Sequence, residues 1–266
     1  MLRGPPMRQA LHAEWTKLRT TAGPGWLLVA AMALTVALSA MVVGAVNYPF
    51  AGPDQVLDLT KLSLSGIQLG QALVAILAVL VIGNEYSTGM IRATLTAMPR
   101  RPTVLAAKAA IVSGVALAAG AIAVLGCLLV GRLILPGHGF TAAHGYPLLS
   151  LADGPVLRAV AGSALYLALI ALLSLGAATA VRDSATAIGV VLGLLYLFPI
   201  LTQVVTDPHW QRHLKQLGPM TAGLAIQATT NLHGLPIGPW AGLGVLAAWA
   251  AAALLAGGLL LRLRDA

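Results

Sequence analysis

Six long apolar runs without Asp, Glu, Lys or Arg dominate this sequence. They cover residues 26–46, 64–83, 109–131, 159–181, 184–206 and 240–261. Each run is close to the roughly 20 residues that an α-helix needs to cross the hydrocarbon core of a bilayer. None alternates polar with apolar residues, as a membrane β-barrel strand does. The runs therefore predict an all-α, polytopic membrane protein with six transmembrane helices in a single domain spanning residues 1–266.

Charged residues are scarce and lie at the ends of the apolar runs. Only 9% of the residues are charged, against roughly 25% in soluble domains, and the mean hydropathy is +0.87. The net charge of +8 does not gather into one basic patch, so it indicates membrane orientation and no nucleic-acid partner. The composition excludes a water-soluble globular domain and makes the lipid bilayer the first partner.

The distribution of basic residues predicts that both termini lie in the cytoplasm. With six spans the two ends share a side, and basic residues are enriched on the cytoplasmic side of membrane proteins. One set of segments holds Arg3, Arg8, Lys17, Arg19, Arg92, Arg100, Arg101, Lys108, Arg182, Arg262 and Arg264, and the other holds Lys61, Arg132, Arg158, Arg212 and Lys215. The larger set is predicted to be cytoplasmic. The first run exceeds the 7–15-residue core of a signal peptide, so it is interpreted as a retained helix.

The segment before the first run has the pattern of an interfacial helix. Residues 7–19 place Leu11, Trp15 and Leu18 on one helical face, with basic residues elsewhere. This spacing favours a helix lying flat on the inner leaflet.

The segment between the fifth and sixth runs is predicted to form an extracellular lid over residues 207–239. Residues 208–217 suit a short amphipathic helix at the outer interface. Residues 220–232 are mildly apolar and too short to span, so they suit a surface or re-entrant helix.

A short amphipathic helix is predicted over residues 85–98, on the cytoplasmic side between the second and third spans. Asn84 suits the cap of a helix, and Glu85 suits the positive end of its dipole. Apolar residues from Tyr86 to Met98 form a stripe on one face, and Pro99 ends the pattern because proline lacks a backbone donor. The alternative is an ordinary connector resting on lipid headgroups.

The sequence lacks the groups of a catalytic or energy-converting protein. No predicted span holds an ionisable residue, as an ion-driven carrier or an intramembrane enzyme usually does. No lysine precedes Ser or Thr, so the P-loop of an ATPase is missing. We therefore predict no catalytic residue, no metal site and no cofactor on this chain.

The remaining polar residues are candidates for other roles. Gln68, Gln71 and Gln203 lie within predicted spans and are candidates for lining a pathway. His209 and His213 suit a polar helix face better than a metal site, because no acidic residue follows His209. Cys127, the only cysteine, suits a small core residue.

The segment after the second span resembles a known family. It contains Glu85, Tyr86, Gly89, Met90, Ile91, Arg92, Leu95, Pro99, Arg100, Arg101, Leu105 and Lys108. It is similar to the permease subunits of type-two ABC exporters, especially the Ala/Gly/Leu-rich bacterial kind. Residues 14–19 resemble the amphipathic segment before the first span of that family. Residues 182–184, 219–223 and 262–266 also agree with its layout, so the resemblance covers nearly the whole chain.

The resemblance implies partners and roles. In that family six helices form one half of a dimeric pathway, and a separate ATPase subunit binds each half from the cytoplasm. Docking on the ATPase would then use Glu85, Tyr86, Met90, Ile91, Arg92 and Leu95. A second permease copy or a related permease is implied, with Gly189 and Gly193 as the expected dimer seam. The resemblance also implies a bacterial plasma membrane, with ATP and Mg²⁺ on the partner ATPase.

Other classes of function stay open at this point. An ion-coupled secondary carrier is disfavoured because mid-membrane charges and an evident repeat are missing. A membrane-embedded enzyme is disfavoured because no nucleophile–base pair or metal set lies at one depth. A non-transporting membrane anchor or immunity protein also fits the composition. For a permease, the uncharged spans point to an amphiphilic substrate such as a drug, a peptide or a lipid.

Overall fold

The computed structural model is a bundle of helices. It describes residues 7–20, 22–48, 57–90, 96 and 101–263. Six helices in this part are long and apolar enough to cross a membrane. They are α2 (Ala22–Ala45), α4 (Ile67–Ser87), α6 (Arg101–Ile134), α7 (Gly154–Val181), α8 (Ser184–Val204) and α11 (Pro239–Leu263). No strand occurs among the described residues, so the predicted all-α class with six candidate spans is confirmed.

Several of these helices are longer than the charge-free runs that predicted them. α4 continues to Ser87 instead of ending at residue 83, and α6 begins at Arg101 instead of residue 109. With 34 residues, α6 is roughly 50 Å long, against roughly 30 Å for the hydrocarbon core. A charge-free run stops at the first charged side chain, whereas a helix continues into the headgroup region. Glu85 and Lys108 therefore lie inside long helices, which corrects the expectation that the spans hold no ionisable residue.

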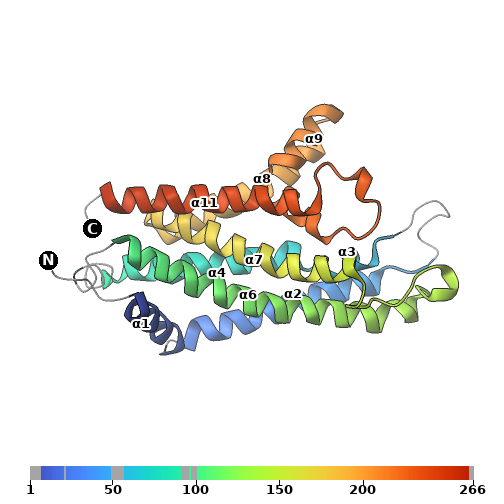
Figure 1. Ribbon diagram of the computed structural model, residues 1–266, viewed down its shortest axis with the longest axis horizontal. Coiled ribbons are helices and arrows are strands. Elements are labelled where there is room, and N and C mark those ends of the chain that lie inside the picture. Colours follow the sequence, from blue (N-terminus) through green and yellow to red (C-terminus); the bar gives the residue numbers. More distant parts are fainter. Residues whose placement is uncertain (1–6, 21, 49–56, 91–95, 97–100, 264–266) are drawn as a thin grey trace.

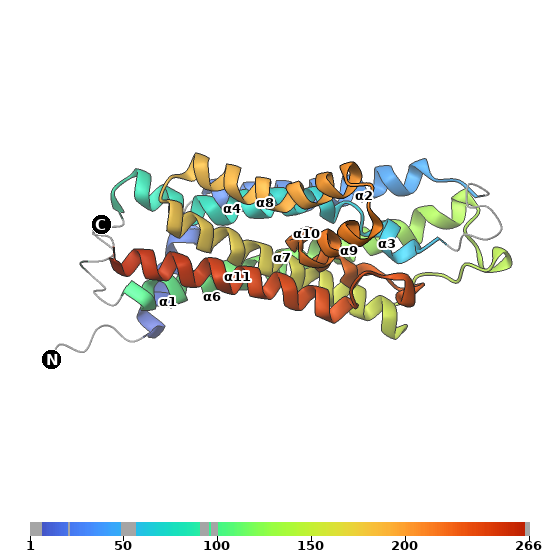
Figure 2. The ribbon, with the colours of Figure 1, turned by 90° about the horizontal axis from the view of Figure 1, so that it is seen from above.

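The bundle has two different ends (Figure 1). α1 (Met7–Thr20), the last turn of α4, the start of α6 and the end of α11 share one end, which we call the α1 end. The opposite end, called the α9 end, carries α3 (Leu59–Ser63), α9 (Pro208–Leu217) and the loops around them. Figure 2 shows the same division in a view turned by 90°. The start of α1 and the end of α11 lie on one side, as an even number of spans requires.

α7 is the central helix of the bundle. In its most apolar window 67% of the residues are buried, against 17% in α8 and 22% in α2 and α11. A Cβ added to Gly176 of α7 would lie 2.5 Å from the backbone of Ala253 in α11. A Cβ on Gly257 of α11 would lie 2.7 Å from the carbonyl oxygen of Gly176. Small residues thus let α7 and α11 touch along their backbones, which is how helices associate in lipid.

The crossing of α2 and α4 depends on a pair of glycines. A Cβ on Gly66 would lie 2.1 Å from the carbonyl oxygen of Thr35, and one on Gly70 would lie 2.1 Å from the Thr35 Oγ1. Ser39 Oγ accepts a hydrogen bond of 3.0 Å from the Gly66 amide. The Gly66-x-x-x-Gly70 spacing therefore allows the closest approach of α2 to α4.

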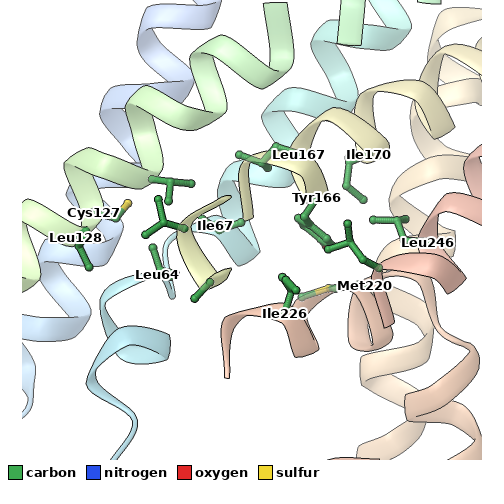
Figure 3. Close-up of a cluster of buried hydrophobic side chains, with 14 of the residues drawn as sticks. Leu64, Ile67, Cys127, Leu128, Tyr166, Leu167, Ile170, Met220, Ile226 and Leu246 are labelled. Carbon is green, nitrogen blue, oxygen red and sulfur yellow. The ribbon is translucent and has the colours of Figure 1, made fainter. Parts of the chain in front are cut away.

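The segment after α9 turns back into the bundle. α10 (Pro219–Gly223) and the 3-10 helix η3 (Leu224–Gln227) pack against α7 and α11. Met220 and Ile226 are buried, and Figure 3 shows them beside Tyr166 of α7 and Leu246 of α11. Residues 219–227 therefore form a plug at the α9 end instead of lying on the surface.

Polar contacts hold the residues that directly follow this plug. Asp58, the N-cap of α3, accepts hydrogen bonds from the Thr229 amide at 2.5 Å, the Thr229 hydroxyl at 2.7 Å and the Thr230 amide at 3.1 Å. Arg158 of α7 donates to the carbonyl of Ala228 at 2.5 Å. The segment is thus tied to the loop before α3 and to the start of α7.

Two nearby glycines of α11 differ in how closely they approach the plug. A Cβ on Gly242 would lie 2.0 Å from the carbonyl oxygen of Ala222, whereas a Cβ on Gly244 meets nothing within 4 Å. We expect Gly242→Ala to destabilise the protein by about 1–3 kcal/mol, because backbone atoms must move apart. Gly244→Ala should stabilise it by about 0.5–1 kcal/mol, because alanine loses less backbone entropy in a helix. Thermal unfolding of the purified protein in detergent measures both, and equal shifts would contradict the packing described.

Candidate functional site

Four charged side chains meet at the α1 end in a closed ring. Glu14 and Lys17 come from α1, Glu85 from the last turn of α4, and Lys108 from the second turn of α6. Glu14, Glu85 and Lys108 are buried, with 3%, 5% and 1% of their surfaces exposed. Lys17 is partly exposed. The ring joins three helices that are far apart in the sequence.

Each lysine of the ring contacts both carboxylates. Lys108 Nζ lies 2.7 Å from Glu14 Oε2 and 2.7 Å from Glu85 Oε1. Lys17 Nζ lies 3.0 Å from Glu14 Oε1 and 2.8 Å from Glu85 Oε1. Two negative and two positive charges give a neutral ring, so the burial of each charge is compensated by two partners.

Glu85 depends most on this compensation. It lies in the last turn of α4, where the partial negative charge of the helix terminus repels a carboxylate. The expected placement of Glu85 at the start of a helix is therefore wrong, because α4 continues through it to Ser87. The ammonium groups of Lys17 and Lys108 offset both the helix dipole and the loss of water.

The ring keeps Lys17 charged. Burial lowers the pKa of Lys17, but its hydrogen bonds to Glu85 and Glu14 outweigh burial and raise the pKa above the ordinary 10.5. This contribution to stability is fully present below pH 10.5 and is lost only as the pH rises through the raised pKa. Lys17 therefore stays charged throughout the physiological pH range.

Two arginines close the same end of the bundle around α11. Arg101, at the start of α6, donates to the carbonyl of Leu261 at 2.6 Å, and Arg182 donates to the carbonyl of Leu260 at 3.4 Å. These guanidinium groups occupy the negative end of α11, where cations are favourable. Arg182 also lies over the ring of Tyr86, 5.8 Å from its centroid. The ends of α4, α7 and α11 are therefore linked beside the charge ring.

The residues expected to dock on an ATPase differ in where they lie. Glu85 is buried in the ring, so its charge is used inside the protein instead of being offered to a partner. Tyr86 is half-buried under Arg182. Met90 follows the turn at Thr88 and Gly89 and is 48% exposed. The others, Ile91, Arg92 and Leu95, lie outside the described residues.

The three expected pathway glutamines do not form one surface. Gln71 is fully buried, and its side chain accepts a hydrogen bond from Tyr166. Gln68 is exposed, and its carbonyl oxygen accepts from Tyr196 at 2.7 Å and from the Gln71 side chain at 2.9 Å. Gln203 is exposed on α8. Gln71 thus belongs to a hydrogen-bond network joining α4, α7 and α8, which is buried at Tyr166 and partly exposed at Tyr196.

The glycines of the expected dimer seam face open space. Gly189 and Gly193 are exposed on α8, and a Cβ on either would meet nothing within 4 Å. Gly66 and Gly70 differ, because α2 occupies the space that a Cβ on either of them would need. The outer face of α8 is therefore free to approach another helix closely.

The histidines of the lid lie on the exposed surface of α9. The Nε2 atoms of His209 and His213 are 3.0 Å apart. Across the described part of the chain, no group of three His, Cys, Asp or Glu side chains lies close enough to hold a metal ion. The pair makes a polar helix face.

Sequence reasoning missed the ring as a unit, although a signal was present. Glu14 and Glu85 are the only glutamates in the chain, and both adjoin predicted spans on the same side. Glu14 and Lys17 have the i, i+3 spacing of helix ion pairs. The contact between residues 14, 85 and 108 nevertheless depends on how three helices pack, which no local pattern encodes.

Removing Lys108 should test the ring directly. Lys108→Met leaves two buried carboxylates with only Lys17 to balance them, so we expect a loss of about 3–5 kcal/mol in unfolding free energy. Lys61→Met removes an exposed lysine at the α9 end and should change stability by less than about 0.5 kcal/mol. Chemical denaturation of both purified variants measures the difference. Similar stabilities would show that the ring is not a structural element.

Comparison with known proteins supplies the family. A family model described as "ABC-2 family transporter protein" matches residues 10–200, which run from α1 into α8 and contain all four ring residues. No curated protein matches the chain in sequence. The match confirms the resemblance to type-two ABC permeases, and the six candidate spans give a multi-pass membrane protein. The chain therefore belongs to the ABC-2 family of transporter proteins and is a permease-type transport subunit.

Proposed function

We propose that this permease is the membrane-spanning half of an ATP-driven exporter in the bacterial plasma membrane. A separate ABC ATPase binds the α1 end from the cytoplasm, and a second permease copy or a related permease completes the pathway. ATP and Mg²⁺ are bound by the ATPase, and this chain holds neither. An amphiphile such as a drug, a peptide or a lipid is the proposed substrate class.

The charge ring is the observation that supports this coupling best. The stretch 88–100, where the ATPase is proposed to dock, connects α4 to α6. Glu85 lies three residues before this stretch and Lys108 lies eight residues after it, and the two are in direct contact. Force applied to the stretch from outside therefore reaches α4 and α6 together, because separating them would break a buried ion pair.

The ring also extends this movement to α1. Glu14 contacts Lys108, and Lys17 contacts Glu85, so α1 is fastened to both helices that flank the docking stretch. α1 precedes α2 with only residue 21 between them. A displacement of the docking stretch is thus passed to α2, α4 and α6, three of the six candidate spans.

The proposed orientation follows from charge. The larger set of basic residues includes Arg8, Lys17, Arg101, Lys108, Arg182 and Arg262, which lie at the α1 end, and basic residues are enriched on the cytoplasmic side. The plug of residues 219–227 then lies at the extracellular end of the bundle. It is packed against α7 and α11, so outward release of a substrate requires it to shift.

A substitution at Met90 tests the docking stretch. Met90→Asp places a charge where an apolar contact with the ATPase is proposed, which should cost about 2 kcal/mol or more at an interface hot spot. We expect co-purification with the partner ATPase to fall at least about tenfold, with unchanged thermal stability. Leu232→Asp, an exposed site at the α9 end, is the control. Normal recruitment and transport by Met90→Asp would contradict the proposal.

Cysteine cross-linking tests the dimer through α8. In a Cys127→Ser background, Gly193→Cys should form a disulfide-linked dimer in membranes, because Gly193 lies on the open face of α8. Val191→Cys should not, because Val191 is 1% exposed and faces the core. If neither variant, or both equally, gives the dimer on a non-reducing gel, α8 is not the seam.

A further inference from the structure

An apolar groove lies beside the charge ring. Its walls come from α2, α4 and α6, its floor includes Leu167 of α7, and Trp15 of α1 stands at one end. The cavity volume is about 250 Å³. Glu14 enters the ring while its neighbour Trp15 lines the groove, so α1 contributes to both.

The groove offers nothing to a polar molecule. Thr35 is the one lining residue with a polar side chain other than the Trp15 indole, and its hydroxyl donates a hydrogen bond of 2.7 Å to the carbonyl of Ala31. Water needs two to four polar partners to stay in a cavity, and an engineered apolar cavity of about 150 Å³ stays dry but holds benzene. A groove of this size and lining is therefore suited to hydrocarbon.

Small residues on α6 and the course of α2 create this space, the small residues being Ala116, Ala119, Gly120 and Ala123. α2 meets α4 and α6 closely at Thr35 to Ser39, where Cβ atoms on Gly66 and Gly126 would collide with it. Toward the α1 end the α2 positions lining the groove are Gly25, Leu28, Ala31 and Met32. A Cβ on Gly25 would meet nothing within 4 Å. α2 thus leaves space between itself and the pair α4 and α6 at the positions nearest α1.

The groove is continuous with the lipid-facing surface of the candidate spans. On α2, Leu27, Val29 and Leu34 are 49%, 50% and 47% exposed, and on α6, Leu117 and Ile122 are 39% and 62% exposed. These side chains do not line the groove and are exposed on the two helices that form its walls. In a bilayer, hydrocarbon chains surround this surface, so the groove opens onto lipid and not onto water.

We propose that this groove binds one acyl chain of a phospholipid from the leaflet around the α1 end. The lining recognises a hydrocarbon chain and has no group for a particular headgroup, which fits a bulk membrane lipid better than a selected cargo. The groove also lies away from α8, where the dimer seam is proposed. The bound chain fills the gap between α2 and the pair α4 and α6, and so sets the distance of α2 from the ring.

Photolabelling of the full-length protein in nanodiscs tests this site. The probe is a phosphatidylethanolamine with a diazirine in the middle of one acyl chain. We expect labels at Met32, Leu77 and Val115 of the groove to exceed those at Leu255 and Leu259, which are exposed on α11. Val115→Trp fills the groove and should reduce labelling of Met32 and Leu77 about tenfold, equivalent to about 1.4 kcal/mol.

Matched variants distinguish the effect of filling the groove from a general destabilisation of the fold. Leu117→Trp adds the same bulk two residues away on the exposed face of α6 and should leave groove labelling unchanged. Leu28→Trp and Val29→Trp repeat the comparison from α2, so the test survives if Val115→Trp does not fold. Uniform labelling of all exposed apolar residues would overturn the proposal, as would a co-purified amphiphile other than a phospholipid in the groove. The readout needs no ATPase, so it is independent of the coupling proposal.

Discussion

Helices in a bilayer gain little from the hydrophobic effect by touching one another, so this bundle depends on how closely its backbones approach. The close contacts occur where glycine faces a partner backbone or a small side chain. Gly176 and Gly257 bring α7 against α11, and Gly66 and Gly70 bring α4 against α2. The contacts of α7 with α4, α6 and α11 place it at the centre of the bundle. The same contacts leave α2 and α8 with broad apolar faces toward lipid or toward another protein.

Charges are confined to the ends of the bundle, where they complete what packing begins. At the α1 end the ring of Glu14, Lys17, Glu85 and Lys108 fastens α1 to α4 and α6. At the α9 end Asp58 and Arg158 hold the segment that follows the plug. A permease needs elements that move as blocks between states. The ring makes a block of the α1 end, whereas the plug is attached mainly by apolar packing and a few hydrogen bonds.

The number of spans was predictable from the sequence because the bilayer demands long uncharged helices. The short helix over residues 208–217 was also predictable, since Asp207 caps it and Pro208 begins it. The end of the second span and the start of the third span were not predictable. Their predicted limits followed the first charged residue, but a charge at a helix end is tolerated when another helix brings the opposite charge. Glu85 and Lys108 satisfy each other in this way, and this shifted both boundaries.

The sequence by itself determined the class of protein, its number of candidate spans and the family it resembles, because these follow from composition, run length and local motifs. Only the tertiary structure decided which polar groups meet. Gln71 was expected to face a pathway, and packing buried it against Tyr166. Glu85 was expected to face a partner, and packing enclosed it between two lysines. A side chain's partners depend on the crossing of helices distant in sequence, and those crossings are set by contacts such as that of Gly66 with Thr35.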